Sequence, residues 1–174
     1  MNVRIERAQE RDVALILELI RGLAEYERLA DQCVATEAGL RDALFGAQPA
    51  AEVLIAFAGE TPAGFALFFH NFSTFLGRRG LYLEDLFVKP EFRRLGIGRR
   101  LLTELARIAV ERGCGRFEWS VLDWNAPAIE FYKRLGAKPL DEWTIFRVTG
   151  EELEKLQDPS SKIQAPRKLH IPNS

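Results

Sequence analysis

Four arginines and two glycines stand close together in one segment whose chemistry suits a phosphate ligand. They follow an apolar stretch that ends at Val88, and they are Arg93, Arg94, Gly96, Gly98, Arg99 and Arg100. Because glycine has no Cβ atom, an anion can approach its backbone closely, and guanidinium groups donate well to phosphate oxygens. The first N–H groups of a helix are unpaired, so a helix that begins at these glycines adds donors of its own.

The same segment has a simpler interpretation, in which the glycines only form a tight turn and the arginines only solvate the helix. The sequence lacks both the GK[ST] ending of a P-loop and the three-glycine spacing of a dinucleotide-binding turn. The predicted strand before the turn, the predicted helix after it and the four arginines favour phosphate binding over the simpler interpretation.

Hydrophobic periodicity predicts the elements that position this segment. We predict helices over residues 12–28, from about 36 to 46, and over 98–111, 126–135 and 151–156. We predict strands over residues 3–6, 52–58, 63–70, 81–88, 117–122 and 143–148, with a polar loop over 71–80. Strands interleaved with helices indicate an α/β domain, which we expect over residues 1–157. Residues 158–174 are rich in proline, serine and lysine without periodicity, so we expect a flexible tail.

The bulk composition argues against several classes of protein. The 174 residues include 24 basic and 25 acidic side chains, so no net field favours nucleic acid or a membrane surface. No apolar stretch is long enough to cross a bilayer, and the N-terminal residues lack the apolar run of a signal peptide. Cys33 and Cys114 lie far apart without a zinc-like spacing, which fits packing roles in a reducing compartment. We therefore expect a cytoplasmic protein that binds no metal, nucleic acid or membrane.

The basic turn resembles the signature of the GNAT superfamily of acetyltransferases, [RQ]xxGx[GA], through Arg93, Gly96 and Gly98. A second block, residues 124–137, resembles the N-x-x-A/S-x-x-F-Y region of the same family. The resemblance implies an α/β (α+β) fold with a twisted, mixed, mostly antiparallel sheet of about six to seven strands, flanked by helices and splayed in the middle. It also implies acetyl-coenzyme A as the co-substrate. The residues implied to bind it are Leu86, Phe87, Val88, Arg93, Arg94, Leu95, Gly96, Ile97, Gly98, Arg99, Asn125, Ala126, Pro127, Ala128 and Tyr132.

A narrower resemblance joins the chain to the spermidine/spermine and thialysine (diamine) N-acetyltransferase branch. It rests on residues 23–27, 82–88 and 131–134, and it runs from about residue 3 to residue 156. The loop at residues 71–77 departs from the polyamine enzymes, which have an acid and a tryptophan there, and is more like the thialysine branch. The resemblance implies a homodimer, and the residues implied to bind the amine are Tyr26, Glu27, Glu84, Asp85, Glu118, Trp119 and Ser120.

The target amine is cationic at neutral pH and must lose a proton before it can attack the acetyl group. We expect Glu84, through an ordered water, to accept that proton while Asp85 helps to hold the substrate. Because neighbours on a strand point to opposite faces, we expect only one of these two acids to do chemistry. The resemblance places the Tyr132 hydroxyl near the thioester sulfur, where it acts as general acid in a direct attack without an acyl-enzyme.

Two other functions use the same residues. The chemistry suits acetylation of a protein or peptide amine, and the fold alone suits a non-catalytic acyl-coenzyme A sensor. The presence of Tyr132 and Glu84 argues against the sensor. A nucleic-acid contact at the basic turn is disfavoured by the near-neutral charge and by the acids beside the arginines. The sequence leaves the physiological amine open.

Overall fold

The computed structural model describes residues 2–157, so the predicted tail over residues 158–174 lies outside the described residues. The chain divides into two compact parts, one that ends at Trp124 and one that starts at Asn125. The single domain expected over residues 1–157 stays a prediction. Within the described residues, no helix combines the length and apolar character needed to span a bilayer.

The first part contains a sheet and three helices, joined in places by short 3-10 turns. Its strands are β1 (Val3–Arg7), β2 (Glu52–Ala58), β3 (Thr61–Ser73), β4 (Arg78–Val88) and β5 (Phe117–Trp119). Its helices are α1 (Val13–Tyr26), α2 (Glu37–Phe45) and α3 (Ile97–Glu111), and its 3-10 turns cover Glu10–Asp12, Ala30–Gln32 and Pro90–Phe92. The second part contains α4 (Ala126–Arg134) and α5 (Gly150–Leu156).

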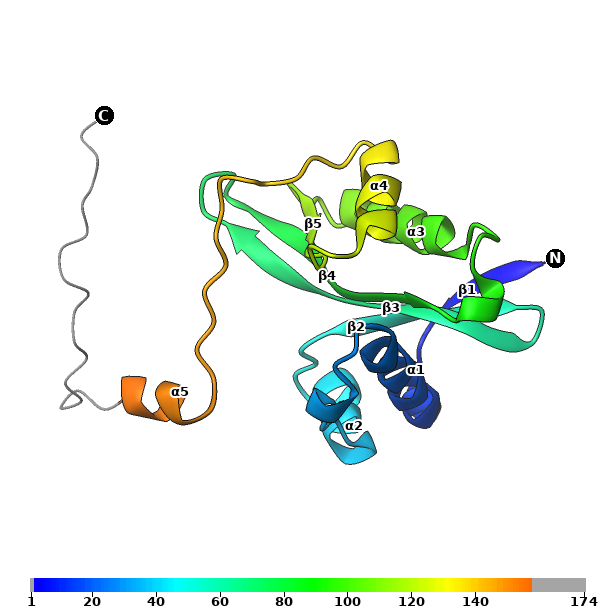
Figure 1. Cartoon of the computed structure of the whole chain (residues 1–174), viewed down its shortest axis with the longest axis horizontal. Coiled ribbons are helices and arrows are strands. Elements are labelled where there is room, and N and C mark those ends of the chain that lie inside the picture. Colours follow the sequence, from blue (N-terminus) through cyan, green and yellow to red (C-terminus); the bar gives the residue numbers. More distant parts are fainter. Residues whose placement is uncertain (1, 158–174) are drawn as a thin grey trace. The chain divides into compact units, whose positions relative to one another are not determined.

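The sheet has the strand order β1-β2-β3-β4-β5. The first three neighbouring pairs are antiparallel, whereas β4 and β5 are parallel. α1 and α2 lie on one face of the sheet and α3 lies on the other (Figure 1). The predicted mixed, mostly antiparallel sheet flanked by helices is confirmed, but the described residues form five strands instead of the expected six to seven.

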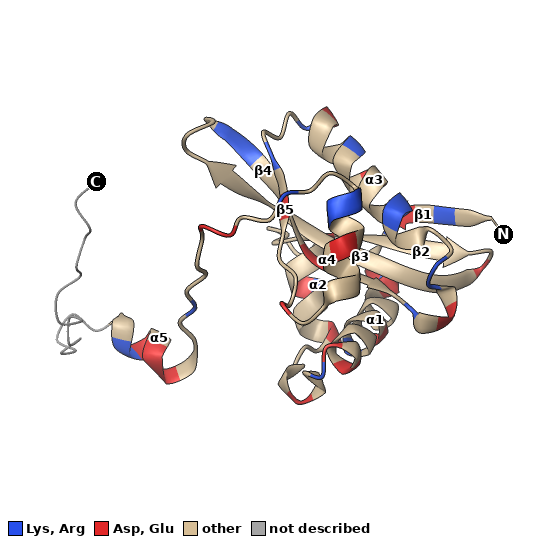
Figure 2. Ribbon diagram, turned by 45° about the horizontal axis from the view of Figure 1, so that its top comes forward, with Lys and Arg blue, Asp and Glu red and all other residues tan. Residues whose placement is uncertain are grey.

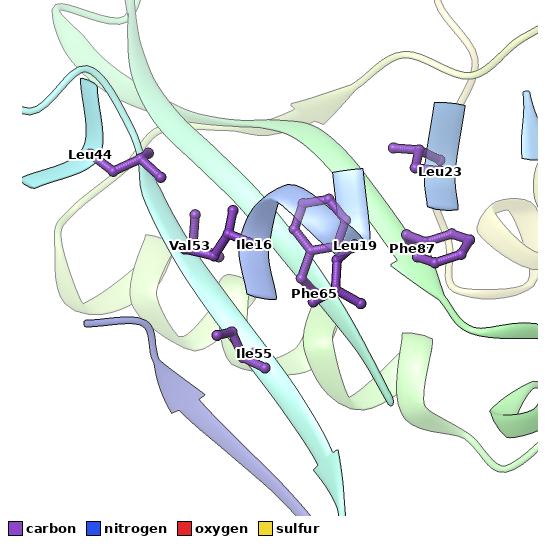
Figure 3. Close-up of a cluster of buried hydrophobic side chains, with 8 residues drawn as sticks. All are labelled: Ile16, Leu19, Leu23, Leu44, Val53, Ile55, Phe65 and Phe87. Carbon is purple, nitrogen blue, oxygen red and sulfur yellow. The ribbon is translucent and has the colours of Figure 1, made fainter. Parts of the chain in front are cut away.

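A cluster of buried apolar side chains holds α1 and α2 against their face of the sheet (Figure 3). Its members are Ile16, Leu19, Leu23, Leu44, Val53, Ile55, Phe65 and Phe87. Full burial of such a side chain contributes about 1.5–3 kcal/mol to the free energy of folding. Contact between α1 and β4 is close, since a Cβ on Gly22 would lie 3.0 Å from the ring of Phe87. The cluster therefore fixes the end of β4 against α1.

The predicted loop over residues 71–80 is mostly wrong. β3 continues to Ser73 and β4 begins at Arg78, and these two residues pair across the hairpin. The turn itself is confined to residues 74–77. The polar composition of this segment misled the prediction because this end of the hairpin is exposed to solvent and needs no apolar alternation.

The predicted last strand over residues 143–148 is also wrong. These residues form neither helix nor strand, and the side chains of Trp143, Ile145 and Phe146 are exposed. β-branched and aromatic residues favour a strand only where a neighbouring edge pairs with them, and no such pairing of this segment occurs within the described chain.

Candidate active site

α3 begins at the basic turn, and its first turn is open. The residue before the helix, Gly96, has a φ of 78°, a left-handed conformation that favours glycine. Within residues 2–157 no side chain caps this helix, and a Cβ on Gly96 would meet no atom within 4 Å. Open space therefore lies beside the first N–H groups of a 15-residue helix, an arrangement that binds phosphate.

The four arginines of the turn divide into two pairs. Arg93 Nε donates to the carbonyl oxygen of Val88 at 3.0 Å, and Arg100 donates to a backbone carbonyl of β1 at the same distance. Arg94 and Arg99 are exposed. Arg93 and Arg100 are thus bound to main-chain carbonyls, whereas Arg94 and Arg99 are better placed to meet an anion.

The apolar residues predicted to bind the cofactor differ in what they present to a ligand. The side chains of Phe87 and Ile97 are buried, so only their backbone atoms can reach a ligand. Leu86 and Val88 are half-buried, and Leu95 is exposed. The predicted contacts of this segment are therefore mainly backbone contacts.

β4 and β5 separate after a short parallel ladder. Residues 81–83 pair with residues 117–119, so the predicted strand over 117–122 is shorter than expected. β4 continues to Val88, and within the described chain no strand pairs with this edge of residues 84–88. Unpaired N–H and C=O groups on a strand edge can bind an extended ligand. Pairing stops here because β5 ends at Trp119, and the expected splaying of two strands stays a prediction.

A β-bulge in β4 separates the two predicted acids. Phe68 pairs with Leu83 and Leu67 pairs with Asp85, so Glu84 is the extra residue of the bulge. Leu67 packs on the cluster beneath α1, and cross-strand partners share a face, so Asp85 lies on the α1 face. Asp85 is half-buried there, whereas Glu84 is exposed.

The carboxylate of Asp85 lies within electrostatic reach of Glu27, the residue that follows α1. Burial, together with the charges of Glu84 and Glu27, raises the pKa of Asp85 from 3.8 to about 6. Burial also raises the pKa of Glu27. The charges of Glu84 and Glu27 create a negative potential at Asp85, which an ammonium group relieves. The three acids therefore form a site suited to a cation, and we call them the acid cluster.

Aromatic rings adjoin the acid cluster at the end of α1. The ring centroid of Tyr26, the last residue of α1, lies 6.2 Å from that of Trp124. The guanidinium carbon of Arg28 lies 5.8 Å from the Trp124 ring centroid. Tyr26 and Trp124 are both partly exposed, so their rings can form a wall for a substrate.

A cavity of about 580 Å³ lies between α1 and the residues that follow β4. Its lining includes Gly22, Tyr26, Phe87 and Pro90 but neither Glu27 nor Asp85. We assign the chemistry to the acid cluster instead, because perturbed carboxylates indicate a reactive site better than a hollow alone.

Glu118, predicted to bind the amine, is held by other side chains. Its Oε2 lies 2.9 Å from Arg116 Nε and accepts a hydrogen bond from Asn71 Nδ2 at 3.2 Å. The ring of Trp119 lies 4.9 Å from that of Phe117. A substrate ammonium at Glu118 would have to compete with this ion pair.

The sequence pattern described as the Acetyltransferase (GNAT) family matches residues 20–137, more than half of the chain. The chain belongs to the GNAT family of acetyltransferases. Members of this family use acetyl-coenzyme A as co-substrate. Within residues 2–157, no group of three or more His, Cys, Asp or Glu side chains is arranged to hold a metal.

Individual relatives narrow the type of GNAT enzyme. The chain is 42% identical over 166 residues to the thialysine N-epsilon-acetyltransferase of Sus scrofa, and this match covers 89% of this chain and 97% of the relative. It is 34% identical over 198 residues to an L-ornithine N5-acetyltransferase of Arabidopsis thaliana, and this match covers 88% of this chain and 87% of the relative. An integron cassette protein from V. cholerae has a TM-score of 0.73 at 30% identity, covering 90% of this chain and 98% of the other. The chain is an N-acetyltransferase.

The second part of this GNAT chain carries the remaining predicted residues. Asn125 Oδ1 accepts a hydrogen bond from the N–H of Ala128 at 3.3 Å and so caps α4, and Pro127 lies in the first turn. Tyr132 is half-buried, and its ring lies 5.4 Å from that of Phe131. The cofactor contacts expected of Asn125, Ala126, Pro127, Ala128 and Tyr132 stay predictions.

Sequence analysis assigned no role to Tyr82 or Trp124. The Tyr82 hydroxyl is hydrogen-bonded to Ser120 Oγ at 2.8 Å, and the Trp124 ring lies beside that of Tyr26 in a tilted arrangement. Trp124 begins the second GNAT-like block, so its position directly before the α4 cap was a usable signal. Nothing in the local pattern around Tyr82 revealed its partner 38 residues away.

Proposed function

We propose that the chain transfers the acetyl group of acetyl-coenzyme A to a primary amine of a small cationic substrate, of the diamine, thialysine or polyamine type. Relatives that cover nearly the whole chain and are named for thialysine and for L-ornithine support a small amine as the acceptor. We further propose, from the family resemblance, that the enzyme is a cytoplasmic homodimer.

The observation that carries this proposal is the proximity of Glu27 and Asp85. Glu27 directly follows α1 and Asp85 lies in β4, so the fold brings together two carboxylates that are far apart in the sequence. Burial, and then the charges of Glu84 and Glu27, raise the pKa of Asp85 to about 6. A cluster with this potential favours a cationic amine over a neutral one. The same acids stand next to the unpaired edge of β4, which suits the pantetheine arm of the co-substrate.

The co-substrate site uses backbone more than side chains. The open first turn of α3, together with Arg94 and Arg99, fits a pyrophosphate. Acetyl-coenzyme A supplies the acetyl group as a thioester. The protein orients that group beside the amine, accepts the proton that the amine loses and donates a proton to the departing thiolate.

We assign the proton acceptor to Asp85 in place of Glu84, the residue that the sequence alone favours. A base works best when its pKa lies near the working pH, and the pKa of Asp85 is about 6. Glu84 is the exposed bulge residue, and its charge helps to raise the pKa of Asp85. We assign the general acid, which protonates the departing thiolate, to the Tyr132 hydroxyl.

The test is thiol release from acetyl-coenzyme A in the presence of thialysine, ornithine, putrescine, spermidine or a lysine-containing peptide. We expect turnover with at least one small amine and none with the peptide. Turnover with the peptide alone would overturn the substrate class, and no turnover with any amine would overturn the proposed activity.

A matched pair of variants tests the acid cluster. Glu27→Gln should raise the KM for the amine about tenfold, which corresponds to about 1.4 kcal/mol, without changing the KM for acetyl-coenzyme A. Glu25→Gln removes an exposed acid two residues earlier, in the last turn of α1, and should leave both values unchanged. Equal effects of the two variants would show that only bulk charge matters.

A further inference from the structure

The guanidinium group of Arg93 is fixed by three contacts. Its Nε donates to Val88 O at 3.0 Å. Its central carbon lies 4.2 Å from the ring centroid of Tyr26 and 5.9 Å from that of Phe87. A cation within about 6 Å of an aromatic centroid is attracted to the ring face. Arg93 therefore joins the basic turn to the end of α1 and to the end of β4.

Tyr26 belongs to the amine side of the site. It is the last residue of α1, it precedes Glu27, and its ring stands beside Trp124. Glu27 directly follows Tyr26 in the chain, so the backbone that holds the Tyr26 ring also holds Glu27 within electrostatic reach of Asp85. The contact between Arg93 and Tyr26 thus connects the phosphate turn with the acid cluster.

The backbone between Arg93 and α3 is short and unusual. Arg94 has a φ of 63° and Gly96 a φ of 78°. A non-glycine residue in the left-handed region is uncommon and is held there by its surroundings. A ligand that binds the first N–H groups of α3 rearranges or stiffens this turn, and Arg93 lies at its other end.

We propose that Arg93 is a positioning residue that couples the two substrate sites, and that it is not a phosphate ligand. It holds Tyr26 against the end of β4, so occupation of the turn by coenzyme A orders the wall of the amine site. This inference rests on the proposed function, which assigns the turn to coenzyme A and the acid cluster to the amine. Coupling of this kind is reciprocal, so the amine strengthens binding of coenzyme A by the same factor.

Fluorine NMR tests the link without any amine. The chain has three tyrosines, so protein labelled with 3-fluorotyrosine gives three signals, which the variants Tyr26→Phe, Tyr82→Phe and Tyr132→Phe assign. Saturating free coenzyme A should shift the Tyr26 signal in the wild-type protein. In Arg93→Gln, which keeps a residue that the GNAT signature allows, coenzyme A should still bind but the shift should vanish.

Arg94→Gln is the matched control, since it removes an exposed cation from the same turn but none of the contacts to Tyr26. This variant should bind coenzyme A more weakly and still show the Tyr26 shift at saturation. A Tyr26 signal that does not move in the wild-type protein, or that moves equally in Arg93→Gln, overturns the inference.

Calorimetry measures the coupling itself. The Kd of thialysine in the absence of coenzyme A, divided by its Kd in the presence of coenzyme A, should be about 5–150 in the wild-type protein. It should approach one in Arg93→Gln and stay at the wild-type value in Arg94→Gln. A wild-type ratio kept in Arg93→Gln overturns the inference while the proposed function stands. Failure of every small amine to bind or react defeats the proposed function, and the fluorine experiment still decides the link from Arg93 to Tyr26.

Discussion

The hydroxyl oxygen of Tyr82 lies 2.8 Å from Ser120 Oγ, beside the point at which β4 and β5 stop pairing. Tyr82 lies in the segment of β4 that pairs with β5, and Ser120 directly follows the last residue of β5. The hydrogen bond joins the two strands just before they separate. It therefore adds a contact at the end of the β4–β5 ladder, next to the unpaired edge of β4.

Loss of this hydrogen bond should destabilise the first part of the chain modestly. Tyr82→Phe and Ser120→Ala should each lower the free energy of unfolding by about 0.5–1.5 kcal/mol. Because both remove the same interaction, the double variant should cost less than the sum of the single variants. Urea denaturation of the four proteins measures this, and strictly additive costs would show that the two hydroxyls act independently.

Asp85→Asn should stabilise the protein at neutral and alkaline pH. The pKa of Asp85 is raised from 3.8 to about 6, so its protonated form is favoured by folding. The stabilising contribution of that proton is complete below about pH 4 and is lost as the pH rises through about 6. Near pH 8 the variant should be more stable than the wild type by up to about 3 kcal/mol, since Asn carries no charge to bury.

Chemical denaturation at several pH values checks this sign. The difference between Asp85→Asn and the wild type should shrink as the pH falls from about 8 to about 4. Glu84→Gln provides a comparison at the exposed neighbouring acid. A stability difference for Asp85→Asn that is constant over this range would contradict the raised pKa.

Gly96→Ala should separate backbone strain from ligand binding when it is compared with Gly113→Ala. Both glycines have a positive φ, of 78° and 66°, and a Cβ on either would meet no atom within 4 Å. Each variant should therefore lose about 1–2 kcal/mol of stability. Only Gly96 lies at the first turn of α3, so only its variant should weaken coenzyme A binding, by about tenfold or more. Equal affinity of the two variants for coenzyme A would contradict the assignment of this turn to the co-substrate site.

Tyr132→Phe should lower kcat by about 100-fold while the Kd for acetyl-coenzyme A stays within about twofold of the wild-type value. The reason is that phenylalanine keeps the ring but cannot donate a proton to the departing thiolate. Steady-state kinetics with thiol detection and calorimetry of the co-substrate give the two values. An unchanged kcat would assign the general acid elsewhere.

Local chemistry made most elements predictable from sequence. A helix was predicted from about residue 36, where threonine is a favoured N-cap residue, and Thr36 Oγ1 accepts the N–H of Gly39 at 3.1 Å at the start of α2. The helices predicted over residues 12–28 and 98–111 likewise match α1 (Val13–Tyr26) and α3 (Ile97–Glu111) closely. These signals act over one helical turn, so no distant residue needs to be known.

Relationships between distant residues were not predictable. The bulge at Glu84 arises from the register between β3 and β4, and it decides which acid lies on the α1 face. Arg100 is bound to a carbonyl of Val3, 97 residues away, and Arg93 contacts Tyr26. Local spacing led to the prediction that these arginines are phosphate donors. It could not reveal their other partners, which only the fold brings near.

The most direct test of the account is the pH dependence of kcat/KM for thialysine from about pH 5 to pH 8. This quantity reports the ionisation of essential groups in the free enzyme. With Asp85 as the proton acceptor, the rate should rise with an apparent pKa near 6 in the wild type, because Asp85 has a pKa of about 6 and must be ionised. In Glu84→Gln the rise should persist at a lower apparent pKa, because the charge of Glu84 helps to raise the pKa of Asp85. The rise should be absent in Asp85→Asn, whose rate should be lower throughout. An unchanged profile in Asp85→Asn, or its loss in Glu84→Gln alone, would contradict the assignment of Asp85 as the proton acceptor.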